Sequence, residues 1–159
     1  MSTDDNIFVA TREPLEAVAE WLGGALGLER IDDAEVGEGK HLLRGRARTV
    51  DGELIFLVEP NVYGEVDPEP EDVSAIDHYP GLLDIRYAGK KDEELQMREA
   101  RAVFDELVRD QADSAMILSH NMALLIAAYL PGAGAHYFDA GTTLDALDQD
   151  TWAPWVVAR

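Results

Sequence analysis

The chain has 159 residues, no cysteine and 47% hydrophobic residues, which suits one globular domain and excludes disulfide scaffolds, thiolate metal sites and cysteine nucleophiles. Its 32 acidic and 13 basic residues give a net charge of −19. Such a field repels phosphate backbones and anionic lipid headgroups, because nucleic-acid binding depends on cations that displace condensed counterions. We therefore expect no direct nucleic-acid ligand and no membrane partner.

The N-terminus and the hydropathy pattern bear on the cellular compartment in which the protein is expected to reside. The chain begins MSTDDN, with acids where a secretory signal would carry a basic region followed by an apolar one. The longest wholly apolar run covers residues 122–130, whereas about 20 residues are needed to span a bilayer. These features predict a cytoplasmic protein in which residues 1–6 form a flexible N-terminus and residues 7–159 form a single α+β domain.

The first elements are a short β-prone run at residues 7–11 and a helix over residues 14–26. Pro14 favours the start of a helix, because a missing N–H costs nothing at an early helical position. Apolar residues then recur at i, i+3, i+4 and i+7 spacing, which predicts one stripe facing a sheet. The stripe consists of Leu15, Val18, Ala19, Leu22 and Leu26.

A hairpin is expected next. Asp51-Gly52 supplies the positive φ angles of a two-residue turn, so residues 41–49 and 53–59 are predicted to pair. Such a turn places Arg44 opposite Glu59. The other side of the pair carries large apolar residues opposite small ones, and we expect it to face the core.

The core face of this hairpin is defined by alternation. It includes Leu43 and Phe56, and the small residue Gly45 leaves room for a packed helix. Residues 81–88 alternate in the same way and predict a third strand. A long connection rich in proline and acids, residues 60–80, separates this strand from the hairpin.

The clearest helix covers residues 90–110, where Phe104 and Leu107 lie on an apolar face that we expect to contact Phe56. Residues 114–119 predict a buried strand. The apolar run that follows, residues 122–130, is ambiguous: its length and alanines favour a helix and its continuity favours a strand, and we favour a helix.

Residues 135–140 predict a last strand, and the apolar tail that contains Trp152 and Trp155 is expected to dock on the body. Taken together, the elements predict a mixed or mainly antiparallel sheet with helices packed on one face.

Catalytic and metal-ligating patterns are weak. The four histidines have no i, i+3 or i, i+4 spacing, and H-E-x-x-H is missing from the sequence, so we expect no metal and no cofactor. Ser119-His120-Asn121 contains residue types used in nucleophilic catalysis, but adjacent strand residues point to opposite faces. We therefore expect no catalytic residues. The histidines are His41, His78, His120 and His136.

An arginine row offers an alternative site. Arg44, Arg46 and Arg48 alternate along one predicted strand, so their guanidinium groups are expected to leave the same face of the sheet. With a histidine they would bind a carboxylate or phosphate, in a small enzyme or an anionic-ligand binder. The opposing interpretation is a solvated face paired with nearby acids.

A proline-restricted acidic loop offers the principal site. Residues 65–72 contain five acids and two prolines, and a restricted loop loses less entropy when an interface orders it. We expect this region to bind a basic protein partner, whose approach the acidic field would accelerate. There are two alternatives to partner binding: the loop is simply solvated, or the whole surface is acidic to suit a salt-rich cytoplasm. The candidate partner-binding residues are Glu65, Asp67, Glu69, Glu71, Asp72, Asp77 and Tyr79.

The chain as a whole resembles the small acidic immunity proteins that bacteria make against their own polymorphic toxins: cysteine-free and α+β, without an evident catalytic set. The resemblance is one of type, and it assigns no family residue to any position. It implies an inhibitor that neutralises a basic toxin domain. A structural or regulatory interaction protein unrelated to toxins is a third hypothesis.

Overall fold

The computed structural model describes residues 4–33 and 35–157. Within these residues, eight strands form one sheet of antiparallel pairs in the order β2-β3-β4-β5-β1-β6-β7-β8. The strands are β1 (Asp5–Ala10), β2 (Glu29–Ile31), β3 (His41–Arg46), β4 (Glu53–Pro60), β5 (Gly81–Tyr87), β6 (Ala115–His120), β7 (Leu124–Leu130) and β8 (Gly134–Tyr137). The helices are α1 (Leu15–Leu26), α2 (Glu93–Arg109) and the short α3 (Gln149–Trp152).

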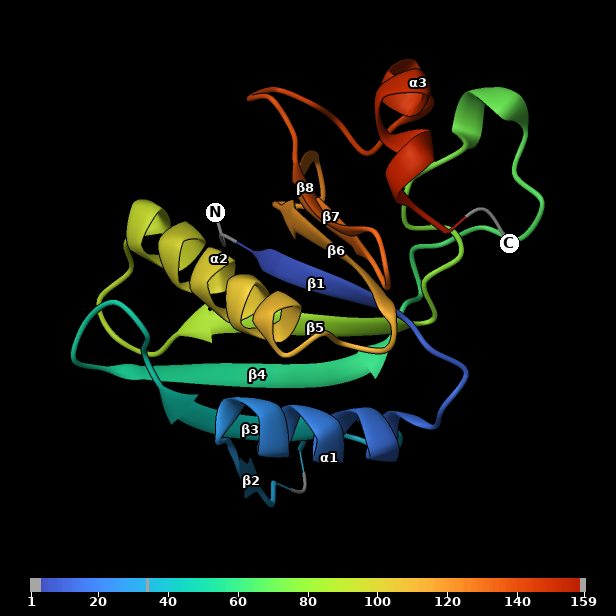
Figure 1. The fold of residues 1–159 in the computed structure, drawn as a ribbon. Coiled ribbons are helices and arrows are strands. Elements are labelled where there is room, and N and C mark those ends of the chain that lie inside the picture. The colour runs from blue at the N-terminus through green and yellow to red at the C-terminus, as the bar shows by residue number, and fades with distance from the viewer. Residues whose placement is uncertain (1–3, 34, 158–159) are drawn as a thin grey trace.

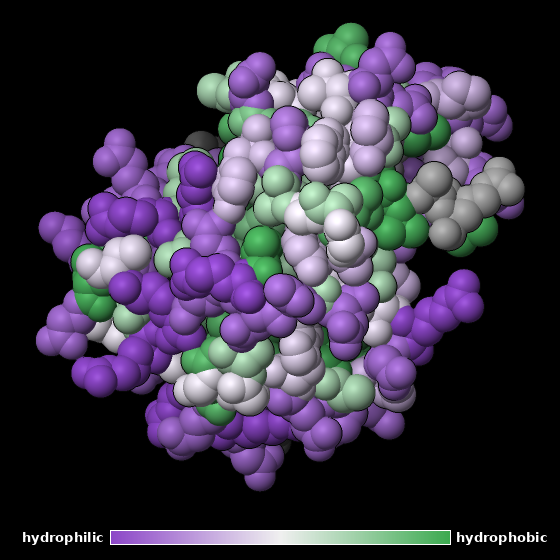
Figure 2. Space-filling view, in the orientation of Figure 1, coloured by the Kyte–Doolittle hydropathy of each residue, from purple (hydrophilic) through white to green (hydrophobic). Residues whose placement is uncertain are grey.

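Helices α1 and α2 lie on the same face of the sheet, as Figure 1 shows. Helix α1 packs on β3 and β4, and α2 packs on β5, β1 and β6. Hydrophilic side chains cover the outward surface of α2 (Figure 2). The prediction of an α+β protein with helices on one face of a mainly antiparallel sheet is confirmed.

Both long helices follow their sequence signals. Helix α1 begins after Pro14 and ends at Gly27, whose φ of 67° is a left-handed conformation that glycine adopts without strain. Asp92 caps α2, because its side chain accepts a hydrogen bond from Leu95 N at 3.1 Å. Phe104 on α2 and Phe56 on β4 are both fully buried in one cluster, as predicted.

The β3–β4 hairpin forms with a different register from the predicted one. Arg44 pairs with Ile55, whereas a two-residue turn would place it opposite Glu59. The connection covers residues 47–52, so β3 ends at Arg46. Because the shift is an even number of residues, every side chain in the pair keeps its predicted face, and Leu43 is buried as expected.

A buried carboxylate from α2 stabilises the longer connection. Glu99 is 0% exposed and accepts hydrogen bonds from the backbone N–H of Arg48, from Thr49 N at 2.6 Å and from the Thr49 hydroxyl. Backbone donors of the loop are thus paired inside the protein. The two segments are about 50 residues apart in sequence, so the turn dipeptide alone gives no sign of this contact.

The predicted helix within residues 122–130 is wrong, because residues 124–130 form strand β7 between β6 and β8. Asn121 and Met122 have φ angles of 54° and 56°, and Ala123 N donates to His120 O at 3.1 Å. Positive φ at both central positions defines a type I′ turn, which joins two antiparallel strands directly. Pairing along both edges of β7 outweighs the helical preference of its alanines.

The opposite face of the sheet carries a second core. Phe8 of β1 and Ile117 of β6 contact residues from two segments, 61–80 and 138–157, that fold over this face. Trp152 is 4% exposed and Val156 is 9% exposed in this cluster, which confirms that the C-terminal tail docks on the body.

The prediction of a flexible N-terminus is wrong for residues 5 and 6, and its residues 1–3 lie outside the described residues. Asp5 and Asn6, which were expected in a flexible N-terminus, lie in the central strand β1 and are 2% and 4% exposed. This strand pairs with β5 on one side and β6 on the other. Among the described residues, no helix has the length and apolar content needed to cross a membrane.

Candidate functional site

Segments 61–80 and 138–157 lie side by side at one end of the molecule, where the acidic connection and α3 meet (Figure 1). Ser74 and Asp145 form a β-bridge, and Ala75 N donates to Leu144 O at 2.9 Å. We call these two segments the acidic end. Their sequences contain no lysine or arginine and carry six acids in the first segment and four in the second. The acids are Glu65, Asp67, Glu69, Glu71, Asp72, Asp77, Asp139, Asp145, Asp148 and Asp150.

Two polar side chains give the acidic connection its shape. Asn61 donates to Ile76 O at 3.0 Å and to Tyr79 O at 2.8 Å. The carboxylate of Asp77 accepts from Glu65 N at 3.1 Å and from Ser74 N at 2.8 Å. These bonds join the start of the connection to its end and close the loop, from which Glu65, Val66 and Asp67 project outward.

Large apolar side chains are exposed among the acids of the acidic end. Val66 is 92% exposed, Val62 76% and Tyr63 56%, and Leu147 of the second segment is 89% exposed. Exposed aromatic and aliphatic groups with a polar surround are typical of protein-binding surfaces. The acidic end therefore combines a field of one sign with apolar groups able to anchor a partner.

The structure places most of the predicted partner-binding residues on this surface. Glu65, Asp67, Glu69, Glu71 and Asp72 are exposed. Their side chains face solvent, so a partner can contact them directly.

Tyr79 is not a surface anchor. It is 1% exposed in the second core, and its hydroxyl accepts from Val157 N at 3.0 Å. Burial raises its pKa to about 12. Asp77 is half-buried and stabilises the loop from inside. Tyr63 is an exposed aromatic residue of the loop that sequence reasoning missed. Its position between Asn61 and Gly64, residue types that favour turns, could have indicated that it is exposed.

The arginine row does not assemble into a site. Arg44 and Arg46 are exposed on the sheet face opposite the helices, and Arg44 pairs with Glu29 at 3.1 Å. Arg48 follows β3 and turns to the helix side, where its Nε lies 2.7 Å from Glu106 Oε2. The expectation that all three guanidinium groups share one face is therefore wrong. His41 lies two residues before the buried Leu43, on the helix face, and so points away from Arg44 and Arg46. Its Nδ1 lies 3.4 Å from Arg30 Nη1 and 3.4 Å from Glu16 Oε2.

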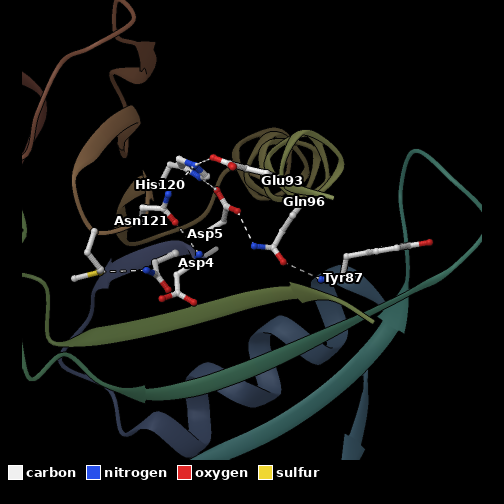
Figure 3. A network of polar contacts seen from close by, with 9 residues as sticks. Asp4, Asp5, Tyr87, Glu93, Gln96, His120 and Asn121 are labelled. Carbon is white, nitrogen blue, oxygen red and sulfur yellow. Dashed lines mark hydrogen bonds and ion pairs between the residues drawn. The ribbon is translucent and has the colours of Figure 1, made fainter. Parts of the chain in front are cut away.

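A buried polar network lies on the helix face of the sheet, where β1 and β6 meet the start of α2 (Figure 3). His120 Nδ1 lies 2.7 Å from Asp5 Oδ1, and its Nε2 lies 2.9 Å from Glu93 Oε1. Gln96 Nε2 donates to the second oxygen of Asp5 at 3.0 Å. The His120 side chain is 4% exposed, so the imidazole is enclosed between two carboxylates.

The surroundings favour a protonated imidazole. Burial alone lowers the pKa of His120, but its hydrogen bonds to Asp5 and Glu93 outweigh burial and raise the pKa above the usual value. Burial raises the pKa of Asp5, against the opposing effect of hydrogen bonds from His120 and Gln96. The network can therefore hold its proton to a higher pH than a free imidazole would, and its hydrogen bonds tie α2 to the sheet.

Within Ser119-His120-Asn121, the expectation that neighbours stay apart is wrong for one pair, because Asn121 lies in the turn after β6 and its Nδ2 is 3.2 Å from His120 Nε2. The network nevertheless gives no support to the catalytic interpretation of this triplet. Ser119 pairs with Asn6 and Leu125, and its side chain lies on the other face of β6 from His120, as the alternation predicts. Sequence reasoning missed the link between Asp5 and His120, because they are about 115 residues apart and become neighbours only through strand pairing.

In the part of the chain that the structure describes, no three histidine, aspartate or glutamate side chains are grouped so that they could hold a metal ion. Among the described residues, no histidine contacts Arg44, Arg46 or Arg48, so the acidic end is the most developed candidate site. No known protein family, curated protein or solved structure matches this chain.

Proposed function

We propose that this protein is an acidic protein-binding module that captures a basic protein partner at the acidic end. The observation that carries the proposal is the segregation of charge: ten acids without a lysine or arginine occupy two segments that lie together. A surface that serves only solubility needs no such segregation, because interspersed charges of both signs keep a protein soluble.

The physical basis is electrostatic steering followed by apolar anchoring. A patch of one sign accelerates the approach of an oppositely charged partner and orients it before contact. Exposed apolar side chains such as Tyr63 and Val66 then bury area once the partner has docked. The closed loop that carries them limits the entropy lost on binding.

A basic toxin domain is the partner class that we propose, with the protein acting as its immunity protein. Toxins that act on nucleic acid carry basic surfaces, since phosphate binding requires cations. An acidic surface is complementary to such a site and can cover it. The resemblance in type to immunity proteins supports the same assignment.

The test is co-purification from the native host, followed by binding kinetics with two matched variants. The first variant reverses Glu65, Glu69, Glu71 and Asp72 to lysine. The second reverses four acids outside the acidic end to lysine. Each reversal adds +2, so both variants change the net charge by +8. The control acids, all exposed, are Glu13, Glu20, Asp51 and Glu94.

The loop variant should reduce the association rate constant roughly tenfold or more at low ionic strength, and the control variant should reduce it far less. The wild-type rate should also fall with added salt, because the Debye length shrinks from about 10 Å at 0.1 M to about 3 Å at 1 M. Equal slowing in both variants would show that bulk charge alone matters, and recovery of no basic partner would overturn the proposal.

A further inference from the structure

The acidic end contains a cavity of about 320 Å³ between its two segments. Its apolar lining includes Val73, Trp152 and Val156, and its polar lining includes Asp67 and Asp77. This volume is at the lower end of the range for small-molecule sites, so it suits a group of side-chain size.

Burial differs between the two kinds of lining. Trp152 and Val156 are 4% and 9% exposed, whereas Asp67 is exposed and Asp77 is half-buried. The apolar side chains therefore form the depth of the cavity and the carboxylates its rim. Trp152 Nε1 donates to Asp145 O at 3.0 Å, which fixes the orientation of the indole.

An apolar interior with an anionic rim is complementary to an alkyl chain that ends in a cation. Lysine and arginine have this form, because their methylene stems pack on apolar surface while the charged head stays near water or a carboxylate. No lysine or arginine lines the cavity among the residues that the structure describes. Its described lining includes one imidazole, that of His78, so a cation entering the cavity would meet the carboxylates of Asp67 and Asp77 without competition from a lysine or arginine of that lining.

We infer that this cavity receives a lysine or arginine side chain of the basic partner. The inference rests on the proposed function, and it names the contact by which the acidic end selects its partner. Steering by the exposed loop acids brings the partner close, and insertion of one basic side chain beside Asp67 then fixes its position.

The experiment uses small probes, so it needs no knowledge of the partner. The N-acetyl methylamides of lysine, arginine and norleucine are titrated into ¹⁵N-labelled protein, and the indole N–H of Trp152 and the backbone amides of Val73 and Val156 are followed by NMR. The lysine or arginine probe should shift these signals with a Kd of about 1 mM, as expected for a single side chain. The norleucine probe, which is apolar but uncharged, should bind at least several-fold more weakly.

Two conservative variants separate a specific contact from bulk charge. Asp67→Asn removes the rim charge and should weaken binding of the cationic probe at least threefold. Asparagine tolerates the φ of 51° at this position, so the loop should keep its shape. Asp72→Asn makes the same change in net charge on an exposed residue that does not line the cavity, and it should leave the Kd unchanged.

Equal binding of norleucine, equal weakening by both variants, or no shift at the three signals would each overturn the inference. The partner experiment is independent, because its loop variant leaves Asp67 intact. Loop-dependent capture of a partner without probe binding would refute the cavity contact alone. Probe binding without any basic partner would refute the proposed function, and would leave the cavity only as a site for a cationic side chain.

Discussion

Arg48 Nε lies 2.7 Å from Glu106 Oε2, which ties the β3–β4 connection to α2. The same guanidinium donates to Leu26 O at the end of α1. One side chain from a loop thus joins both helices that cover the sheet, although its position in the sequence suggests a surface row with Arg44 and Arg46.

The Arg48–Glu106 pair should stabilise the protein more than a surface pair does. Its side chains are 16% and 31% exposed, whereas those of Arg44 and Glu29 are 48% and 70% exposed. Double-mutant cycles with alanine should give a coupling energy of about 1–2 kcal/mol for the first pair and under about 0.5 kcal/mol for the second. Equal coupling energies from urea denaturation would contradict the distinction.

Phe104→Ala should lower the free energy of unfolding by about 3–5 kcal/mol, through lost burial and the cavity left behind. Phe104 is 0% exposed and belongs to the same cluster as Leu107 and Phe56. Leu147→Ala is the control, because Leu147 is 89% exposed and its truncation should cost little. Chemical denaturation measures both, and a loss below about 1 kcal/mol for Phe104→Ala would mean that the α2 face contributes little to stability.

The sequence predicted those features that depend on local periodicity. The apolar stripes of α1 and α2 and the alternation of β3 and β4 specify which side of each element is buried, because burial follows the helical and strand periods. The predicted faces of the hairpin are correct although its register is not. The register differs by an even number of residues, so Leu43 and Phe56 stay on the predicted side of the sheet.

The errors and omissions concern contacts between distant segments. Tyr79 was predicted as an interface anchor because aromatic residues often serve that role, yet the docked C-terminal tail encloses it and pairs its hydroxyl with Val157 N. The Asp5–His120 pair depends on β1 entering the middle of the sheet, and the hairpin register depends on Glu99. No local pattern encodes such pairings.

Glu99→Gln should destabilise the protein by roughly 1–3 kcal/mol. The amide NH₂ group of glutamine would point at donors from which the Glu99 carboxylate accepts hydrogen bonds. Those donors are the N–H groups of Arg48 and Thr49 and the Thr49 hydroxyl. Glu94→Gln makes the same chemical change on an exposed position of α2 and should change stability by less than about 0.5 kcal/mol. Similar denaturation midpoints for the two variants would show that Glu99 is dispensable for the connection.

The His120 network should make stability depend on pH. The folded protein raises the pKa of His120 through Asp5 and Glu93, against the effect of burial, whereas the unfolded chain has an ordinary value of about 6.5. Below about pH 6.5 both states hold the proton and the stabilisation is fully present. As the pH rises through the raised pKa, the folded state loses the proton and with it one donor to a carboxylate.

The free energy of unfolding should therefore fall as the pH rises above about 6.5, with a slope of at most about 1.4 kcal/mol per pH unit. The pKa of Asp5, raised by burial, makes stability depend on pH in the same direction. Urea denaturation across this range should give a flatter profile for His120→Gln than for the wild type. His136→Gln is the matched control, because His136 stacks on Trp155 with ring centroids 4.4 Å apart, outside the network, and should keep the wild-type slope. Parallel profiles for the wild type and His120→Gln would show that the proton on His120 does not contribute to folding stability.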